Sequence, residues 1–274
     1  MEINREDYNR YLNGELLIGD DYNLAQITEW YKDEKEAYAD LGSKVLEEYK
    51  YEYHNINITH GFNKINEVES FNKVLGIGAA YGNEFEPIAS KIKEIHIIEP
   101  SDSLVSDEIF GLTPVYKKPT INGQIDYADN TFDLITCFGV LHHIPNVSFV
   151  VSELYRVLKP GGFILIREPI ISMGDWRGAR KGLTARERGI PVDLYKSIID
   201  RNSFKVVSAN YCFSFTSVLQ RKFGFLFEKP IYAYRSYVYF DKLVSFFLSW
   251  NIKYHATSIL HRFAPQNIFY VLKK

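Results

Sequence analysis

Cysteines, long apolar runs and an apolar leader are scarce or missing in this sequence. The 274 residues include two cysteines, Cys137 and Cys212, which cannot form a disulfide framework and lack the spacing of metal ligands. No stretch reaches the ~18 uninterrupted apolar residues of a membrane-spanning helix. The charged start, MEINREDYNRYLNGELL, lacks the apolar core of a signal peptide. We therefore expect a cytoplasmic protein without a membrane span.

An excess of charge of one sign is also missing. The chain has 32 Lys and Arg residues against 34 Asp and Glu residues, a formal net charge of -2, so nothing favours nucleic acid as the main partner. The hydrophobic share of 46% and the charged share of 24% are those of an ordinary globular protein. The length allows one large domain with additions.

The most informative stretch that is present is VLGIGAAYG, residues 74–82. An apolar run typical of a buried strand passes into a glycine-rich turn, and residues 83–93 then follow a helical pattern. Such a corner can bind an anion or a nucleotide, because glycines let a ligand approach closely and a helix start offers unpaired N–H groups. Glu99 ends the next strand, where it can accept hydrogen bonds from a ribose or, alternatively, cap a helix at Ser101.

From Phe71 onward, strands alternate with helices. This alternation predicts an α/β fold with a doubly wound, mostly parallel sheet, whose ligands bind at the carboxyl ends of the strands. The expected strands are 73–78, 94–100, a short one near Val115, 131–140, 163–169, 205–213 and 266–274, and the expected helices are 83–93, 101–110, 147–159 and 191–204.

Four motifs in this order resemble one known family. VLGIGAAYG, IHIIEP, NTFDLITCFGVLHHIPN and LYRVLKPGGFILIREP, within residues 71–168, are similar to the class I S-adenosylmethionine-dependent methyltransferases. The resemblance implies a Rossmann-like, seven-stranded fold and S-adenosylmethionine as the cofactor. Together with apolar residues at helical spacing near the N-terminus and the aromatic residues near the C-terminus, it predicts four segments: an N-terminal helical cap (1–70), the methyltransferase core (71–216), an aromatic-rich insertion (217–264) and a final core strand (265–274).

The resemblance carries the cofactor site over to particular positions. It implies that the turn wraps the methionine part of the cofactor, that Glu99 binds the ribose and that Asn122 reads the adenine edge, with Asp126 and Tyr127 as alternatives. Two positions depart from the family, which has an acid in place of Gly76 and a glycine in place of Ala80, so a substitute anchor from the N-terminal helices is expected. The residues expected to contact the cofactor are Gly76, Gly78, Ala80, Gly82, Glu99, Pro100, Asn122 and Phe138, with Tyr31 and Tyr38 added from the aromatic N-terminal helix, which either packs on the domain or covers the cofactor.

Candidate catalytic residues follow the later motifs. His142 and His143 lie where a strand turns into a helix, so at most one is expected to face the acceptor. Either bonds the loop backbone, or His143, the preferred candidate, acts as the general base that takes a proton from an acceptor hydroxyl. Glu168 ends a later strand and is either a second base candidate or an ion-pair partner of Arg167 or Arg177. Nothing in the sequence requires a metal.

A basic loop follows Pro169. It either forms a solvated face with local ion pairs or binds an anionic acceptor, because guanidinium groups bind phosphate and carboxylate in a bidentate way. The loop also resembles that of bacterial surface-polysaccharide methyltransferases, which implies a nucleotide-linked or phosphorylated sugar as the acceptor. The candidate acceptor-binding residues are Arg167, Asp175, Trp176, Arg177 and Arg180.

Aromatic residues gather in residues 217–264. They form an added hydrophobic subdomain, a homodimer surface or part of the acceptor pocket, and YFDKLVSFFLSW has few basic residues for a membrane-surface role. The sequence thus predicts a methyltransferase that methylates a hydroxyl of an activated sugar. The alternatives are another small polar acceptor (an amine, a carboxylate or a phosphoester) or a non-catalytic cofactor-binding partner.

Overall fold

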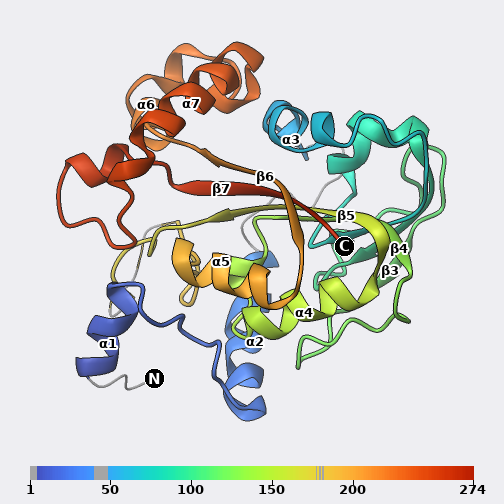
Figure 1. Ribbon diagram of the computed structural model, residues 1–274, viewed down its shortest axis with the longest axis horizontal. Coiled ribbons are helices and arrows are strands. Elements are labelled where there is room, and N and C mark those ends of the chain that lie inside the picture. The colour runs from blue at the N-terminus through green and yellow to red at the C-terminus, as the bar shows by residue number, and fades with distance from the viewer. Residues whose placement is uncertain (1–4, 40–48, 177, 179, 181) are drawn as a thin grey trace.

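The computed structural model of the chain describes residues 5–39, 49–176, 178, 180 and 182–274 (Figure 1). Seven strands form one sheet in the order β3-β2-β1-β4-β5-β7-β6. The pairs from β3 to β5 are parallel, whereas β7 lies antiparallel between β5 and β6. This topology confirms the expected doubly wound, mostly parallel sheet. The strands are β1 (Phe71–Ile77), β2 (Ile92–Ile98), β3 (Val115–Lys117), β4 (Phe132–Phe138), β5 (Leu158–Pro169), β6 (Lys205–Cys212) and β7 (Asn267–Lys273).

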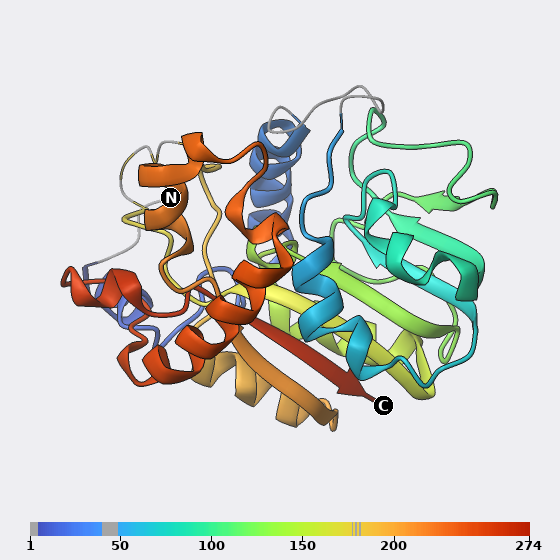
Figure 2. The same cartoon turned by 90° about the horizontal axis from the view of Figure 1, so that it is seen from above.

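Helices cover both faces of the sheet. Figure 1 shows α3, α6 and α7 above the sheet and α2, α4 and α5 below it, and Figure 2 gives the same arrangement from above. The α-helices are α1 (Arg5–Leu12), α2 (Leu24–Ala39), α3 (His54–His60), α4 (Val147–Val157), α5 (Val192–Arg201), α6 (Thr216–Phe223) and α7 (Arg235–Leu248). Short 3₁₀ helices are η2 (Phe62–Lys64), η3 (Asn83–Lys91), η4 (Leu141–His143), η5 (Gly224–Leu226), η6 (Ile231–Ala233), η7 (Ser249–Asn251) and η8 (Leu260–Phe263).

Two buried cores follow from the alternation of side chains along the strands. Leu75 of β1 and Ile135 of β4 pack with α4 and α5, whereas the residues before them, Val74 and Leu134, pack with α3 and η3. A sheet that is buried on both faces needs nearly continuous apolar strands, which is how the segments 74–77 and 134–138 read. Because β1 and β4 are parallel neighbours, their carboxyl ends lie side by side at one edge of the sheet.

Several local expectations differ from the structure. Residues 83–91 form a 3₁₀ helix rather than an α-helix, and Pro87 within it has no N–H to donate to an α-helical bond. Residues 101–110 contain no helix; Ser101 and Ser103 instead bond each other in a turn. The chain enters β5 at Leu158, before Pro160, so Pro160–Gly162 lie within a strand. Residues 54–60 form α3 within the expected N-terminal helical cap, where the sequence predicted no helix with these bounds.

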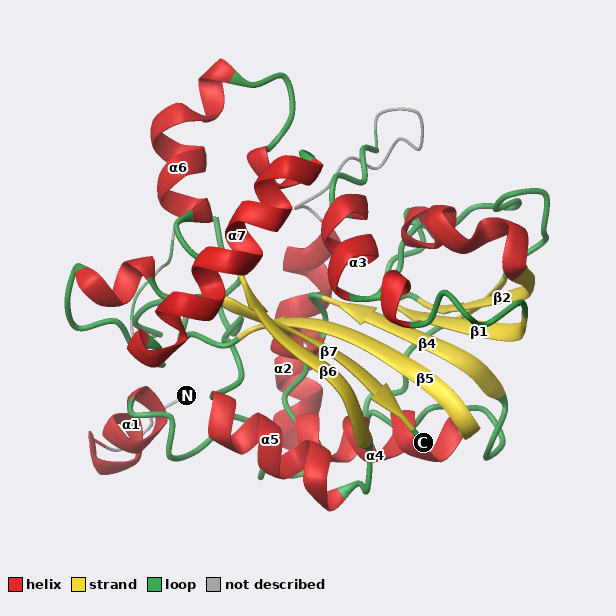
Figure 3. Ribbon diagram, turned by 45° about the horizontal axis from the view of Figure 1, so that its top comes forward, coloured by secondary structure: helices red, strands yellow, loops and turns green. Residues whose placement is uncertain are grey.

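The N-terminal part was expected to be helical and contains α1 and α2. The segment 216–263 carries α6, α7 and four 3₁₀ helices (η5 to η8) between β6 and β7 (Figure 3). The four domain boundaries stay predictions. Among the described residues, no helix has the length and apolar character needed to cross a membrane.

Candidate active site

The glycine-rich turn follows β1 and lies against the loop after β4. Gly78 and Gly82 both have positive φ angles, 59° and 72°. A Cβ atom on Gly78 would meet Cγ2 of Val140 at 2.8 Å, so the turn has no room for a larger residue there. Ala80 also has a positive φ of 45°, although it is not a glycine. The turn is therefore a strained backbone curve that surrounding contacts hold in place.

Glu99 holds this turn to the end of β2. Its side chain is 1% exposed and accepts hydrogen bonds from the backbone N–H groups of Ala80, at 3.2 Å, and Ser101, at 2.9 Å. Burial raises the pKa of Glu99 to about 7, against the lowering effect of these two bonds. Ile98 and Pro100, its two chain neighbours, line an open pocket with about 980 Å³ of empty space. Glu99 thus supports the edge of this first pocket.

The first pocket has mostly apolar walls from three parts of the chain. Trp30 and Tyr31 of α2 form one wall, the loop after β4 forms another, and residues 119–125 form the third. Gln124 lines the pocket, whereas the amide oxygen of Asn122 accepts bonds from Thr120 and Gln124 within a turn. Burial raises the pKa of Tyr31, and the nearby Glu99 adds to the shift. Tyr38 lies in α2, but its side chain is outside the described part of the structure.

A buried acid lies beside Gly76, where the sequence lacks one. Gly76 of β1 pairs with Thr136 of β4, and the hydroxyl of Thr136 donates a hydrogen bond to Glu84, which is 3% exposed. A Cβ atom on Gly76 would meet Cβ of Ala79 at 2.5 Å, so no acid fits at position 76. Glu84 therefore places a carboxylate on the sheet face that residue 76 would use. Sequence reasoning missed Glu84 because it lies in the next element.

Glu84 lies near aromatic side chains and is shielded from solvent. Burial raises the pKa of Glu84 to about 7, while Thr136 and Arg167 act in the opposite direction. Tyr49 packs edge-on against Tyr81, with ring centroids 5.1 Å apart. The pKa of Tyr49 rises to about 12, first through burial and then through the charges of Glu84 and Glu99. Tyr49 thus lies near both acids.

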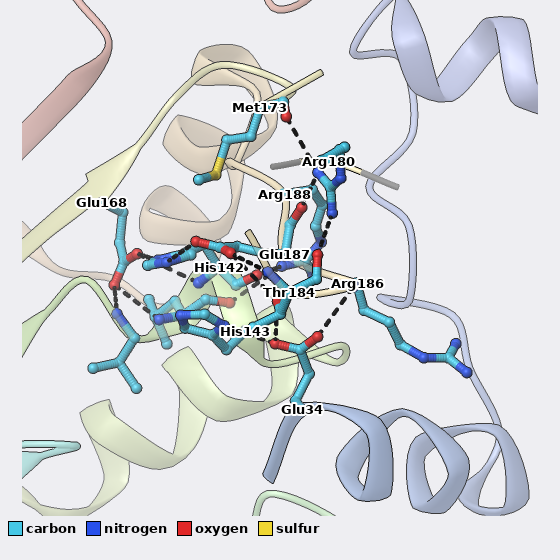
Figure 4. Close-up of polar contacts among 12 residues, drawn as sticks. Glu34, His142, His143, Glu168, Met173, Arg180, Thr184, Arg186, Glu187 and Arg188 are labelled. Carbon is cyan, nitrogen blue, oxygen red and sulfur yellow. Dashed lines mark hydrogen bonds and ion pairs between the residues drawn. The ribbon is translucent and has the colours of Figure 1, made fainter. Parts of the chain in front are cut away.

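Beyond β4, a histidine–carboxylate network fixes the loop that carries the VLHHIPN motif (Figure 4). Nδ1 of His142 lies 2.8 Å from Oε2 of Glu168, and its Nε2 lies 3.4 Å from Oε1 of Glu187. Glu168 is fully buried and also accepts bonds from the N–H groups of Val140 and Leu141, both at 2.8 Å. Glu168 also accepts a bond from Sγ of Cys137 in β4, at 3.9 Å, and lines neither pocket described here; its role as a base stays a prediction.

The two histidines have opposite protonation tendencies. Burial lowers the pKa of His142, but the bonds to Glu168 and Glu187 outweigh burial and raise it to about 9. Burial and the neighbouring His142 lower the pKa of His143, whose Nδ1 lies 2.7 Å from Oε2 of Glu34 on α2. His142 is therefore a cation at neutral pH and His143 is neutral.

The same network offers metal-type ligands. Ligand atoms of His142, His143 and Glu187 all lie within 4.8 Å of one another. Arg188, fully buried, donates to the backbone carbonyls of Leu141, His142 and Ile144 and brings a fixed positive charge to this loop. Arg188 and the protonated His142 thus place two positive charges beside the carboxylates of Glu168 and Glu187.

A second pocket opens at the carboxyl ends of β4, β5 and β6 and the amino end of the antiparallel β7, with about 1090 Å³ of empty space. Phe138, His142 and Arg167 line it, together with Tyr53 and Tyr232, whose rings stack with centroids 4.8 Å apart. Gly139 lines both this second pocket and the first. The two pockets are therefore adjacent and share the backbone at the end of β4.

Arg167 is a buried cation at the wall of the second pocket. It is 5% exposed, donates one hydrogen bond to Oδ1 of Asn57 at 3.1 Å, and lies 4.1 Å above the ring of Tyr53. Among the described residues, no acid forms an ion pair with Arg167. A guanidinium group has five N–H donors, so most of them are available to a bound anion.

The cations of the basic loop are used differently. Arg180 donates to the backbone carbonyls of Glu187, at 2.6 Å, and Thr184, at 2.9 Å, and Arg186 pairs with Asp33. The other candidates from the loop are also engaged: Asp175 accepts a bond from Tyr8, and Trp176 donates to the carbonyl of Ser172. Arg177 lies outside the described residues. The described loop cations thus bond within the protein, and of the described acceptor-binding candidates Arg167 is the one that lines a pocket.

Comparison with known proteins assigns one part of the chain to a family. Residues 75–166 match the family described as "Methyltransferase domain". They are a class I S-adenosylmethionine-dependent methyltransferase domain. The domain spans the glycine-rich turn, Glu99, the VLHHIPN loop and most of β5.

Relatives and solved structures agree with this methyltransferase domain. The demethylmenaquinone methyltransferase of Lactobacillus johnsonii is 36% identical over 94 residues, 31% of this chain and 38% of that protein. A ubiquinone biosynthesis O-methyltransferase of Pseudomonas putida is 36% identical over 52 residues, 19% of this chain and 22% of that protein. The chain thus spans less than half the length of the curated relatives it matches.

Solved structures share the fold. A Leishmania major S-adenosylmethionine-dependent methyltransferase superposes with a TM-score of 0.56 at 14% identity, covering 89% of this chain and 83% of that one. A Haemonchus contortus phosphoethanolamine N-methyltransferase in complex with S-adenosylmethionine gives a TM-score of 0.52 at 17% identity, covering 80% of this chain and 52% of that one.

The residues of the methyltransferase domain fit the cofactor. Two buried acids with raised pKa values, Glu84 and Glu99, lie on the two sides of a turn whose glycines leave no room for side chains. The apolar first pocket beside Glu99 suits a purine base, and Gly139 opens it toward the second pocket. The individual residue roles taken from the sequence stay predictions.

Proposed function

We propose that the chain transfers the methyl group of S-adenosylmethionine to a hydroxyl of a small anionic acceptor, a phosphorylated or nucleotide-activated sugar used for bacterial surface polysaccharide. One observation carries this proposal: two pockets meet at Gly139, one apolar and bordered by the cofactor motifs, the other aromatic and charged. Two adjoining pockets allow donor and acceptor to be held in line, which is the main catalytic requirement of a direct displacement.

Each cofactor-binding role belongs to a residue placed above. S-adenosylmethionine supplies a reactive methyl group on a sulfonium centre. Glu99 would accept hydrogen bonds from the ribose, the pocket wall with Trp30 and Tyr31 would cover the adenine, and Glu84 would accept the amino group of the methionine part. We infer that Glu84 is the substitute anchor that the family's missing acid requires.

The acceptor roles come from the second pocket. Arg167 would bind the phosphate or carboxylate of the acceptor, because its donors are buried, charged and without an acidic partner among the described residues. The stacked rings of Tyr53 and Tyr232 offer a face for a sugar or a base. Of the basic side chains that line this pocket, His142 has the lower pKa, about 9 against that of a guanidinium group, so we assign the general-base role to the deprotonated form of His142 rather than to His143, which does not line this pocket.

A phenolic ring is the second candidate acceptor. Curated relatives that match this chain are named for ubiquinone and menaquinone biosynthesis, and the aromatic wall of the second pocket would also pack against a ring. A neutral phenol would make no use of the buried Arg167, whereas an anionic sugar would. The charge of this pocket therefore favours the sugar.

The deciding experiment is a methyl-transfer screen read by mass spectrometry. The chain is incubated with S-adenosylmethionine and with nucleotide sugars, sugar phosphates or simple phenols in separate reactions. We expect methylated product from an anionic sugar. Product from neutral phenols alone would replace the sugar proposal with the second candidate. Calorimetry that shows no S-adenosylmethionine binding by the folded chain would refute the enzyme proposal altogether.

A further inference from the structure

The segment 216–263, here called the α6–α7 subdomain, exposes large apolar side chains. Phe225 is 82% exposed, Trp250 is 79% exposed and Phe246 is 72% exposed. Water-facing apolar groups of this size and number mark an interaction surface, because single scattered ones are normal but a gathering of them is costly. The other exposed apolar residues of the subdomain are Phe223, Leu226, Phe227, Tyr234, Tyr239, Phe240, Leu243, Phe247, Ile259 and Leu260.

Helix α7 is amphipathic with its apolar face outward. Its exposed residues Tyr239, Phe240, Leu243, Phe246 and Phe247 follow the three- and four-residue spacing of a single helix face. The buried residues of the same helix are Val238, Asp241 and Ser245, two of which are polar. A helix at the surface of a protein that meets only water has the opposite arrangement.

Hydrogen bonds fix this orientation. Oδ2 of Asp241 accepts a bond from the N–H group of Phe213 at 2.7 Å, and Oγ of Ser245 donates to Oγ of Ser214 at 2.9 Å. Rotating α7 to bury its apolar face would break both bonds. It would also expose residues 213–215, the stem that joins β6 to α6. The outward apolar face is therefore built into the fold and is not a loose packing of the helix.

The same subdomain is basic. Residues 216–263 contain seven Lys and Arg residues against two acids, and one of these acids, Asp241, is buried. Among the described residues, only Lys229 of the seven has an acidic partner, Glu52 at 3.9 Å. The remaining six are Arg221, Lys222, Arg235, Lys242, Lys253 and Arg262, on a chain whose net charge is -2.

We propose that the α6–α7 subdomain docks on a membrane surface that contains anionic lipids. Aromatic side chains interleaved with Lys and Arg suit the interface between headgroups and acyl chains, where rings insert and cations meet lipid phosphates. A second copy of the chain fits less well. A symmetric dimer through this surface would place the same unpaired cations against one another. Figure 3 shows α6 and α7 on the far side of the sheet from α5, so lipid contact would leave the α5 side in water.

The acceptor pocket lies next to this surface. Thr216, Ser217 and Gln220 of α6, together with Tyr232 of η6, line the second pocket. Docking through the subdomain would therefore bring the acceptor pocket close to the lipid surface.

The test is vesicle binding by the full chain. It uses vesicles of phosphatidylcholine alone and vesicles in which roughly one third of the lipid is phosphatidylglycerol. We expect the chain to co-sediment with the anionic vesicles at least about tenfold more strongly than with the neutral ones. Trp250 reports on insertion, because it is 79% exposed, whereas Trp30 is 2% exposed and Trp176 is half-buried. Its fluorescence should shift to shorter wavelength on anionic vesicles, and Trp250→Phe should abolish the shift.

Matched variants separate the apolar and the charged contributions. The double variant Phe246→Ser with Phe247→Ser should reduce anionic-vesicle binding by at least about tenfold, whereas Leu24→Ser, which changes a 60% exposed residue of α2, should not. Arg262→Glu should cost at least about fivefold, and Lys196→Glu on the exposed side of α5 should cost little. Circular dichroism of each variant checks that it folds.

Three results would overturn the proposal. The first is absence of binding to either kind of vesicle. The second is vesicle binding that the Phe246→Ser, Phe247→Ser variant retains. The third is sedimentation velocity showing a dimer that this double variant dissociates, because the surface would then be an interface between copies of the chain. None of these results depends on methyl transfer, so the proposed function can fail or hold independently.

Discussion

Replacing Glu84 with Gln tests the proposed anchor for the methionine part of the cofactor. Glutamine keeps the volume of the side chain and an oxygen that can accept the hydrogen bond from Thr136, but it removes the negative charge. Glu84 is 3% exposed and lies on the sheet face of Gly76, so water cannot replace the lost carboxylate. The variant therefore removes one charge-assisted bond and little else.

The magnitude follows from the kind of bond. A buried carboxylate that accepts a hydrogen bond from an ammonium group contributes about 1.5–3 kcal/mol, which corresponds to about a 10- to 150-fold change in Kd. We expect Glu84→Gln to weaken S-adenosylmethionine binding within this range. Because burial raises the pKa of Glu84 to about 7, the affinity of the unchanged protein should also fall as the pH decreases below 7.

Calorimetry with two ligands isolates the contact. 5′-Methylthioadenosine keeps the adenine, the ribose and the sulfur but lacks the amino group. Glu84→Gln should leave its Kd within about twofold of the unchanged protein while weakening S-adenosylmethionine. Equal losses for both ligands, or no loss for S-adenosylmethionine, would refute the assignment of Glu84 to the amino group.

The same variant should make the protein more stable at alkaline pH. A carboxyl group whose folded pKa is raised from 4.5 to about 7 binds a proton in the folded state that the unfolded state has lost. The free energy of unfolding therefore falls as the pH rises from 4.5 to 7, by about 3 kcal/mol in total. Glu84→Gln should raise the melting temperature by about 5 °C at pH 8 and have little effect at pH 4. An equal effect at both pH values would show that Glu84 is not perturbed.

The remaining predictions concern the ribose, the acceptor and the base. Glu99→Gln should weaken S-adenosylmethionine and 5′-methylthioadenosine alike by more than about tenfold, and unchanged affinity in calorimetry would remove Glu99 from the site. Arg167→Gln should raise the KM for an anionic acceptor by about 10- to 100-fold without changing cofactor affinity; equal acceptor KM values would contradict its role. The kcat/KM should rise about tenfold per pH unit up to about pH 9, the raised pKa of His142, and His142→Gln should abolish this rise. Glu187→Gln should move the profile to lower pH, because one of the two carboxylates that stabilise the imidazolium is lost, and an unmoved profile would exclude His142 as the titrating group.

The sheet could be predicted because its signal is continuous along the chain. Strands such as 132–138 are buried on both faces, so they appear in the sequence as continuous apolar runs. Such runs can be recognised without knowing which residues they contact in the fold. The position of Glu99 followed from the same reasoning, since a residue at the carboxyl end of β2 must lie beside the turn after β1. The short elements were less predictable. Residues 83–91 have helical spacing, but spacing alone does not distinguish a 3₁₀ helix from an α-helix.

The charged residues of the site could not be sorted from sequence. The cluster after Pro169 suggested an anion site, yet Arg180 and Arg188 donate to backbone carbonyls of the protein itself. Arg167, one cation among many in the sequence, is the one whose neighbours are aromatic rings and an amide. Whether a cation is neutralised depends on contacts between distant segments, and no local pattern encodes these contacts.

The orientation of α7 is another feature that local sequence patterns do not predict. Residues 235–248 have the composition of a core helix, and periodicity alone places their apolar stripe inward. The structure places it outward because Asp241 and Ser245 find buried partners, Phe213 and Ser214, in the stem after β6. A buried acid left without such partners would cost more than the exposed rings do, so the polar bonds decide which face of the helix meets the protein. The apolar face is then available to a partner, and the unpaired cations around it favour an anionic membrane surface over a second copy of the chain.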